Sequence, residues 1–436
     1  MDTVVVGLVG VILLLGLIAL NIPIAFAMAL VGFTGFSVLT SVTVGFNMVA
    51  KEIFNTFSSY NLSVIIMFTW MGFLAYYSGI GTSLYILAYR LIGHWPGGLA
   101  VATQVACGIF GAICGSNTAT AATMGAIALP EMKKYKYDAS LSTASIAAGG
   151  VLGVLIPPSV IFIVYGIATE QSIGRLFMAG IIPGILLMFL YIAAVILVTL
   201  RKPELGPAGP KASWKERIEA TRGGLLEVIV VFAISMGGLF AGWFTPTESG
   251  AVGSAGVLAV ALIEKRLTRE SFKKSLLDTT RITAMIMLLI AGAMMFGRFM
   301  AICRIPFAVA TWAGALALPP FVVLLIIVFI YLILGCFIDA LALVLLTVPI
   351  FYPVVVGTLG YDPIWFGVIV VLVVAMGVIT PPVGMNVYVI KGVAPDVPLE
   401  TIFKGIWPFL GAVIICILIL MAFPQLATFL PDLLIN

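Results

Sequence analysis

Charged side chains are what this sequence lacks most. Asp, Glu, Lys and Arg make up 9% of its 436 residues, whereas 62% are hydrophobic and the mean hydropathy is +1.23. A soluble globular domain carries about 25% charged residues. Because a chain that crosses lipid must pair its backbone groups internally, the long apolar runs predict an all-α, polytopic membrane protein.

Other absences exclude further classes of protein. His94 is the only histidine, so a His-based catalytic site or metal site has almost nothing to draw on. There is no P-loop, HExxH or nucleophile-elbow motif, and the net charge of +4 is too small to indicate nucleic-acid binding. The five cysteines show no CxxC spacing and lie in apolar runs, which predicts free buried thiols. The sequence therefore predicts neither an enzyme nor a nucleic-acid-binding protein.

The sequence contains one short motif that occurs twice. Residues 153–158 read Gly-Val-Leu-Ile-Pro-Pro, and residues 377–382 read Gly-Val-Ile-Thr-Pro-Pro. A double proline cannot continue an α-helix, because it lacks backbone donors and restricts the residue before it. We therefore expect broken helices over residues 138–170 and 362–395. Interrupted segments at matching places in two halves are typical of secondary transporters.

The remaining apolar runs predict spans and hairpins. Segments 97–133 and 320–353 are long enough to enter the membrane and return, and the small or polar residues at their centres predict two re-entrant hairpins. Segments 82–96 and 302–319 carry interfacial Trp and Arg residues, which predicts horizontal arm helices. Continuous spans are expected over residues 3–22, 24–46, 61–89, 174–200, 223–244, 247–263, 279–301 and 400–424.

The distribution of charge predicts the orientation of these spans. If the basic turn at residues 133–136 is cytoplasmic, alternation places 18 of the 22 Lys and Arg residues on that side. This is a strong positive-inside pattern, and it puts both termini on the outer side. Residues 1–200 and 223–436 then follow the same order of elements in opposite directions. This predicts an inverted-topology repeat joined by a cytoplasmic connector at residues 201–222.

The tip of the first hairpin holds the sharpest polar cluster. Residues 115–118 read Gly-Ser-Asn-Thr, which brings hydroxyls, an amide and freed carbonyls together in an apolar region. Hard cations are bound by several oxygens of this kind. Together with the break at residues 153–159, the cluster predicts an ion site. The alternative is that these small polar residues only pack helices together.

The second tip, residues 335–339, ends in an acidic residue. An aspartate in an apolar run is costly, so Asp339 is a functional candidate: it binds a cation, takes up a proton or caps the following helix, and these roles are compatible. Thr380 and Asn386 add polar groups to the second break, as Ser159 does to the first.

Two further charged residues lie near apolar spans. Arg298 is expected to hold the carboxylate of an acidic substrate, with Arg304 as the other candidate. The alternative is that Arg298 reaches out to the outer interface. Glu248 is expected in the first turn of the next span, with Thr247 as the N-cap.

These motifs resemble a known family. The stretches GSNTAT (115–120), IPPS (156–159) and ITPPVGMN (379–386), together with Asp339, resemble the large membrane subunit of tripartite ATP-independent periplasmic (TRAP) transporters over essentially the whole chain. The SNT tip is shared with divalent-anion/sodium symporters of the wider ion-transporter superfamily. The second tip here has no SNT, which departs from those symporters and favours the TRAP family.

The resemblance implies an elevator-type transporter in a bacterial inner membrane. It implies Na⁺-coupled import of an organic acid, of the sialic acid or C4-dicarboxylate class. The partners would be a small four-helix membrane subunit, expected as a separate chain, and a soluble periplasmic substrate-binding protein, besides membrane lipid. The alternative is a stand-alone sodium/anion symporter of the same superfamily.

The resemblance also implies two Na⁺ sites and a substrate site. The first ion site would use Ser116, Asn117, Gly153, Ile156 and Pro157. The second would use Cys336, Asp339, Gly377, Thr380 and Val383. The substrate would meet Arg298, Asn117, Ser159 and Asn386.

Overall fold

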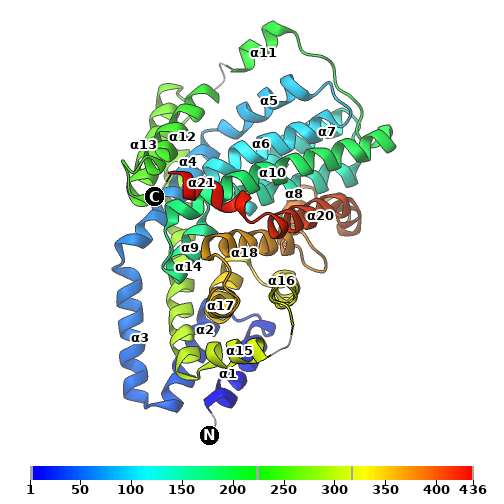
Figure 1. Ribbon diagram of the computed structural model, residues 1–436. Helices are drawn as coiled ribbons and strands as arrows, with labels where there is room; N and C mark the ends of the chain where they lie inside the picture. The colour runs from blue at the N-terminus through cyan, green and yellow to red at the C-terminus, as the bar shows by residue number, and fades with distance from the viewer. Residues whose placement is uncertain (1–2, 222–224, 316–317, 435–436) are drawn as a thin grey trace.

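A computed structural model describes residues 3–221, 225–315 and 318–434 of the chain (Figure 1). Over these residues, all regular structure is helical. The helices before the connector are α1 (Thr3–Ala19), α2 (Ile24–Leu39), α3 (Val42–Phe57), α4 (Ser63–Tyr77), α5 (Ile80–Ile92), α6 (Gly98–Cys114), α7 (Asn117–Lys134), α8 (Ala139–Leu155), α9 (Val160–Thr169) and α10 (Ile173–Arg201).

The connector contains the helix α11 (Trp214–Thr221). Short 3₁₀ turns lie at Tyr60–Leu62 and Pro203–Leu205, and a π-helical turn at Pro353–Thr358. The later helices are α12 (Leu225–Phe240), α13 (Pro246–Ile263), α14 (Arg269–Ile302), α15 (Ile305–Ala315), α16 (Pro320–Gly335), α17 (Ala340–Tyr352), α18 (Pro363–Gly377), α19 (Met385–Val393), α20 (Leu399–Ala422) and α21 (Gln425–Leu434).

Both predicted helix breaks are confirmed. The first separates α8 from α9 around the Pro157–Pro158 pair, and the two helix axes differ by 40°. The second separates α18 from α19 around Pro381 and Pro382. In each case the double proline ends the helix because it cannot donate the backbone hydrogen bonds that would continue it.

Two helical hairpins accompany the breaks. In hairpin 1, α6 and α7 pack against each other and turn at Gly115 and Ser116. In hairpin 2, α16 and α17 turn at residues 336–339. Both match the predicted segments, and their re-entry into a membrane stays a prediction.

Several helices are suited to span a membrane. In the described part of the chain, six are long and apolar enough by length and composition, and the bent α8–α9 pair makes a seventh. The other apolar helices have 10–17 residues. The chain is therefore a multi-pass helical membrane protein, as its composition predicts.

The predicted span 24–46 is wrong. The helix α2 ends at Leu39, and α3 starts afresh at Val42 with Ser41 as its N-cap. The Ser41 side chain accepts a hydrogen bond from the Val44 N–H, which satisfies one of the free donors of the new helix. The helix α3 then runs along the outer edge of the molecule, where the sequence predicts no element after residue 46 (Figure 1).

The predicted span 61–89 is also two helices. The helix α4 ends at Tyr77, and Gly79 adopts a positive φ of 71° before α5 begins. Glycine adopts this left-handed conformation without steric cost, so it ends helices efficiently. The helix α5 therefore begins before the predicted arm helix 82–96.

Two predicted helix starts lie elsewhere. The helix α14 starts at Arg269, ten residues before the predicted span 279–301, because Thr268 caps a charged first turn that composition alone assigns to a loop. The N-cap of α13 is Thr245 and not Thr247. Thr245 and Glu248 form a capping box, with Pro246 in the first turn, where proline is favoured.

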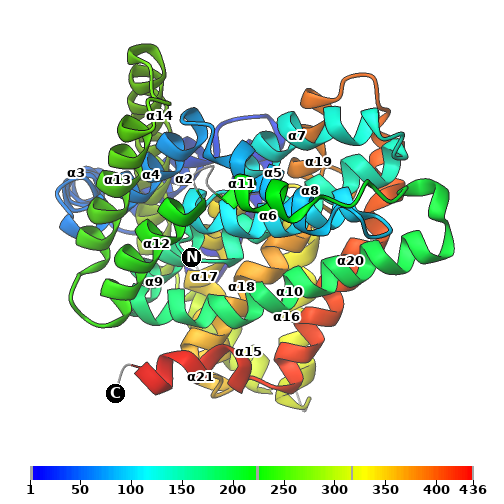
Figure 2. The ribbon, with the colours of Figure 1, turned by 90° about the horizontal axis from the view of Figure 1, so that it is seen from above.

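The helices form two packed groups that meet at the candidate site. In the first group, α4 packs on α13 and α14, and α14 packs on α2. In the second, α8 packs on α6, α7 and α20, α18 packs on α16, and α9 packs on α17 (Figures 1 and 2). The groups touch where α4 meets α6 and α14 meets α17. Each group thus combines helices from both halves of the chain.

Candidate functional site

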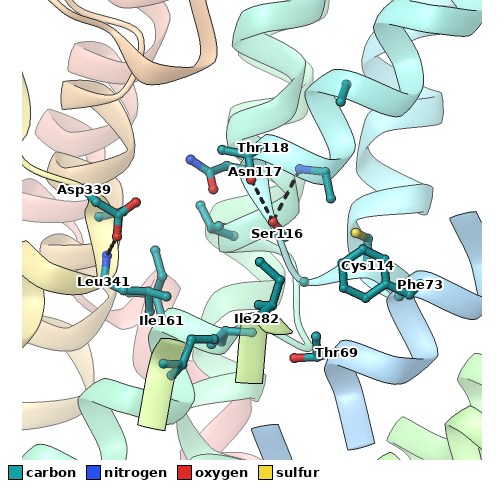
Figure 3. A pocket seen from close by; sticks show the side chains of 18 of the residues that line it. Thr69, Phe73, Cys114, Ser116, Asn117, Thr118, Ile161, Ile282, Asp339 and Leu341 are labelled. Atoms are coloured by element: carbon teal, nitrogen blue, oxygen red, sulfur yellow. Dashed lines mark hydrogen bonds between the residues drawn. The ribbon is translucent and has the colours of Figure 1, made fainter. Parts of the chain in front are cut away.

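A cavity of about 410 Å³ lies where the hairpin turns meet α4 and α14 (Figure 3). Pockets for small molecules typically measure about 300–1,000 Å³, so this one can accommodate a small organic molecule. Its walls are mainly apolar, and within the described part of the chain no lysine or arginine lines it. The polar side chains on its wall are Thr69, Tyr76, Ser116, Asn117, Thr118 and Asp339.

Three helices begin at this cavity. The first residues of α7, α9 and α17 all line it. Their N-caps are Ser116, Ser159 and Asp339, and each cap accepts a hydrogen bond from a backbone N–H of the helix that it begins. Helix N-termini carry partial positive charge and free N–H groups. The cavity can therefore attract an anion without a basic side chain.

The turn of hairpin 1 lies directly against the first helix break. Gly115 has a φ of +64°, and a Cβ added to it would lie 2.7 Å from the Pro158 carbonyl oxygen. The turn conformation and the close approach both require glycine at this position. The hydroxyls of Ser116 and Thr118 lie 3.3 Å apart, so the polar tip predicted from the sequence faces the cavity as a group (Figure 3).

Oxygens of hairpin 1 gather beside Gly153. A Cβ added to Gly153 would lie 2.5 Å from Thr120 Oγ1 and 2.8 Å from the Ser116 carbonyl oxygen. Thr120 Oγ1 is buried and has no hydrogen-bond partner among the described residues. A buried hydroxyl without a partner is costly, and neutral oxygens of this kind suit a small hard cation. The sequence hypothesis missed Thr120, although its position one helical turn after Ser116 places it on the same face.

The other two residues assigned to the first ion site can contribute only backbone oxygens. The Ile156 side chain packs between α6 and α10, close to Gly108 and Gly184. Pro157 is buried beside it and has no polar side-chain atom. The structure therefore brings Ser116, Thr120 and Gly153 together, and it places Ile156 and Pro157 in the adjoining break.

Asp339 lies across the cavity from the tip of hairpin 1 (Figure 3). Its Oδ1 accepts hydrogen bonds from the Leu341 N–H at 3.0 Å and the Ala342 N–H at 3.4 Å. The predicted cap is confirmed, and it uses one carboxylate oxygen. Both of these hydrogen bonds use Oδ1, so Asp339 Oδ2 is the oxygen that a ligand could use. Cys336 has its thiol committed to the Leu332 carbonyl at 3.1 Å.

Hairpin 2 crosses its broken helix at a pair of glycines. A Cβ added to Gly377 would lie 2.5 Å from the carbonyl carbon of Gly335. This contact holds the end of α18 beside the turn that carries Cys336 and Asp339. Thr380 donates its hydroxyl hydrogen bond to the Met376 carbonyl at 2.7 Å. Neither Thr380 nor Val383 lines the cavity, so the structure brings only part of the second predicted ion set together.

Two of the predicted substrate residues contact each other. Asn117 Nδ2 donates to Asn386 Oδ1 at 3.2 Å, and Asn386 Nδ2 donates to the Ala147 carbonyl at 3.0 Å. Asn386 is fully buried, whereas Asn117 reaches the cavity wall. Asn386 therefore links α19 to α7 and α8 from behind the cavity. Ser159 is likewise buried, and its side chain serves as the cap of α9.

An exposed ion pair joins the same two regions at their other end. Lys133, at the end of α7, donates to the Asp396 carboxylate at 3.2 Å. This hydrogen bond lowers the pKa of Asp396 from its ordinary value. Because both side chains are exposed, solvent screens the interaction strongly.

Arg298 does not reach the cavity. Its Nε donates to Glu52 Oε1 on α3 at 2.9 Å, and no arginine among the described residues lines the cavity. Glu52, which the sequence hypothesis did not single out, is buried against α14. Arg304 is exposed and also lies outside the cavity lining. The structure therefore gives the predicted arginine–substrate contact no support.

Comparisons with known families and proteins agree with the resemblance seen in the sequence. Residues 11–426 match the family model described as the tripartite ATP-independent periplasmic transporter, DctM component. The chain is 36% identical over 384 residues to a C4-dicarboxylate TRAP transporter large permease protein of Pseudomonas aeruginosa, covering 88% of this chain and 89% of the relative. It is 33% identical over 420 residues to a sialic acid TRAP transporter large permease protein of Vibrio cholerae, covering 96% and 97%.

The fold is shared with more distant transporters. The structure of the Alcanivorax borkumensis YdaH transporter matches with a TM-score of 0.63 at 14% identity, covering 88% of this chain and 90% of that chain. At this identity the match speaks for the fold alone. The two permease relatives have different named substrates at similar identity, so similarity does not select one substrate.

Proposed function

We propose a function from the premise that this chain belongs to the family of DctM components, the large membrane subunits of tripartite ATP-independent periplasmic transporters. It is thus a multi-pass inner-membrane transport protein and not an enzyme. Its proposed function is the Na⁺-coupled import of an organic acid across that membrane. The observation that carries this proposal is the cavity that three helix N-termini share with the Ser116–Thr118 tip and Asp339.

The substrate carboxylate is proposed to bind at the helix N-termini. The starts of α7, α9 and α17 supply partial positive charge at the cavity wall, which suits an anion. Asn117 adds an amide that can bond to the substrate, while Asn386 and Ser159 support this wall from behind. Arg298 is left out of this proposal because its partner is Glu52. The C4-dicarboxylate and sialic acid classes both present carboxylates that would fit this chemistry.

Two Na⁺ ions are proposed to bind beside the substrate. The first would lie among the carbonyls of Ser116 and the 153–157 break, with Thr120 Oγ1 as an added ligand because it is buried without a partner. The second would lie between Asp339 Oδ2 and the carbonyls that follow Gly377, with Cys336, Thr380 and Val383 contributing backbone oxygens. The C-termini of four helices, α6, α8, α16 and α18, point toward the two turns. Helix C-termini carry partial negative charge, which favours cations.

Two such ions supply enough energy for concentrative uptake. One charge moved through about 100 mV gains about 2.3 kcal/mol, and a tenfold gradient adds about 1.4 kcal/mol per ion. Two Na⁺ ions together supply about 7.4 kcal/mol, from which inward movement of a monoanion subtracts about 2.3 kcal/mol. The remaining ~5 kcal/mol supports roughly 10³- to 10⁴-fold accumulation.

Movement is proposed to occur between the two packed groups of helices. The hairpins and broken helices would move together as an elevator, and α4 and α14 would form part of the static wall. The wall side chains that α14 contributes to the cavity are apolar (Ile282, Met285 and Ile286), so no specific polar bond opposes sliding there. The inverted repeat, the two re-entrant hairpins and the outer placement of both termini belong to this proposal. A small membrane subunit and a periplasmic binding protein complete the transporter.

The decisive test is uptake of labelled C4-dicarboxylates and sialic acid into proteoliposomes. The chain is reconstituted with its small membrane subunit, an inward Na⁺ or K⁺ gradient is imposed, and the binding protein is added or withheld. Uptake that needs both Na⁺ and the binding protein supports the proposal. Na⁺-driven uptake without the binding protein would point instead to a stand-alone symporter, and equal uptake in K⁺ would contradict Na⁺ coupling.

The second ion site has its own test. Asparagine caps a helix about as well as aspartate, so Asp339→Asn keeps the cap of α17 and removes only the charge. We expect the Na⁺ concentration for half-maximal uptake to rise at least tenfold. Asp138→Asn is the matched control, because Asp138 caps α8 in the same way and lies outside the cavity. Unchanged Na⁺ dependence in Asp339→Asn would leave the aspartate as a cap alone.

A further inference from the structure

A second cavity opens on the surface between α10 and α20, away from the candidate transport site. It measures about 400 Å³, and α10 and α20 pack against each other near one edge of the molecule (Figures 1 and 2). The two helices run antiparallel, since the Tyr191 and Phe409 rings lie 5.6 Å apart and Cys416 Sγ lies 3.9 Å from the Pro183 carbonyl oxygen. The C-terminal end of α10 therefore meets the start of α20. We call this cavity, lined from Leu190 to Arg201 and from Pro408 to Ile415, the α10–α20 groove.

Small residues form the floor of the α10–α20 groove. Ala193 and Ala194 come from α10, and Gly411 and Ala412 from α20. A Cβ added to Gly411 would meet no heavy atom within 4 Å. Glycine inside a helix is less favourable than alanine, and here no close contact with the described residues accounts for it. Because Gly411 has no side chain, the groove stays open at this position.

The groove lies on a surface suited to hydrocarbon. Both α10 and α20 are long, apolar candidate spans. Large apolar side chains beside the groove are exposed, among them Phe189, Leu197 and Trp407. Water solvates an apolar surface of this kind poorly, so its chemistry favours an apolar chain as the occupant.

One end of the groove is basic. Arg201 lines it and has no ion pair or hydrogen bond with the described residues. Lys404 lies one helical turn before Pro408 on the same face of α20. Lys202, Glu204 and Glu400 adjoin the same helix ends in the sequence, and the sum of these charges with Arg201 and Lys404 is still positive. From Leu190 to Arg201 an α-helix rises about 16 Å, roughly half of the ~30 Å hydrocarbon core of a bilayer. The groove thus has the length of one leaflet, with cations at the depth of its headgroups.

We propose that the α10–α20 groove binds an anionic phospholipid, with one acyl chain over Gly411 and its phosphate at Arg201. The arginine fork matches phosphate geometry, and an acyl chain can fill the space that Gly411 leaves open. The positive-inside pattern puts this end of α10 at the cytoplasmic leaflet, where anionic lipids bind basic segments. Because α10 and α20 pack directly on α8, the lipid contacts the helices that support the candidate transport site.

Native mass spectrometry of the full-length chain with its small membrane subunit tests the proposal. The protein is titrated with phosphatidylglycerol or phosphatidylcholine, and bound lipid is counted. We expect Gly411→Leu, whose Cβ would meet no heavy atom within 4 Å, to weaken phosphatidylglycerol binding at least tenfold. Gly237→Leu is the control, since a Cβ at Gly237 also meets nothing within 4 Å but lies on α12. Arg201→Gln should abolish the preference for phosphatidylglycerol over phosphatidylcholine while a lipid still binds.

Three outcomes would overturn this inference. One is equal loss of lipid from Gly411→Leu and from Gly237→Leu. Another is equal binding of both lipids to the wild-type protein. The third is loss of the small membrane subunit from Gly411→Leu, because the groove would then hold that subunit and not a lipid. None of these depends on transport, so they are distinguishable from failure of the uptake test.

Discussion

Arg298→Ala should destabilise this protein through a residue on another helix. Glu52 on α3 is 2% exposed, and Arg298 on α14 supplies its ion-pair partner at 2.9 Å. Breaking a fully buried pair by removing one partner costs about 3–5 kcal/mol. The Arg298 side chain is 54% exposed, so solvent already screens the pair. We therefore expect a smaller loss, about 1–3 kcal/mol of unfolding free energy.

A double-mutant cycle isolates this pair. The free energy of unfolding is measured by adding a denaturing detergent to protein held in a mild one, for wild type, Arg298→Ala, Glu52→Gln and the double variant. Because Glu52→Gln removes the buried charge, the double variant should recover most of the stability lost by Arg298→Ala. Lys51→Ala is the control, since Lys51 is exposed and adjacent to Glu52.

The same variants decide between the two roles of Arg298. If it only anchors α3, the folded fraction of Arg298→Ala should transport with an unchanged dependence on substrate concentration. Unfolding free energies equal to wild type would refute the ion-pair reasoning. A higher substrate concentration for half-maximal uptake in folded Arg298→Ala would restore the substrate contact predicted from the sequence.

Three shorter predictions concern the contacts around the cavity. Gly377→Ala should abolish uptake, because its Cβ would lie 2.5 Å from the facing glycine backbone, whereas Gly392→Ala should transport normally because its Cβ meets nothing within 4 Å; equal uptake by both would contradict this. Asn386→Ala should lower the unfolding free energy by about 1–3 kcal/mol, because it leaves the buried Asn117 amide without its partner. Unfolding in a denaturing detergent measures this loss, and a smaller loss would contradict the prediction. Asp396 has a lowered pKa in the folded state, so its ion pair stabilises the folded state fully above the unfolded pKa of about 3.9, and this contribution is lost as pH falls through the lower folded pKa. The stability difference between wild type and Asp396→Asn should therefore shrink as pH falls below about 4 and vanish once the folded carboxylate is protonated, and a difference that does not change with pH would exclude this cause.

Features that depend on a few neighbouring residues were predictable from the sequence. The Pro157–Pro158 pair ends α8 wherever the helix lies, because the missing donors are local. Asp339 caps α17 for the same reason: a short acceptor side chain precedes a helix with free N–H groups. A single glycine is a weaker signal. Gly79 ends α4, whereas Gly72 stays inside it, and only tertiary packing separates the two cases.

Contacts between distant segments were not predictable in this way. Glu52 and Arg298 are 246 residues apart, and in the sequence each is only a single charged residue near an apolar run. The close contact between Gly335 and Gly377 likewise explains why both residues are glycines only once the two helices have been placed in space. Thr120 looks like one more small residue in an alanine-rich helix. Its importance appears only when its buried hydroxyl is found beside Gly153 without a partner.

The placement of Asp339 gives the proposed coupling a physical basis. Its carboxylate lines the same cavity as three helix N-termini, so an incoming substrate anion meets attraction from the backbone and repulsion from this side chain. A Na⁺ ion on Oδ2 would cancel the repulsion and leave the helix ends to bind the substrate. A lysine or arginine in the cavity would bind the anion without Na⁺ and weaken that dependence. None of the described lining residues is basic and Arg298 pairs with Glu52, so in this proposal the helix ends and Na⁺ together supply the attraction for the anion.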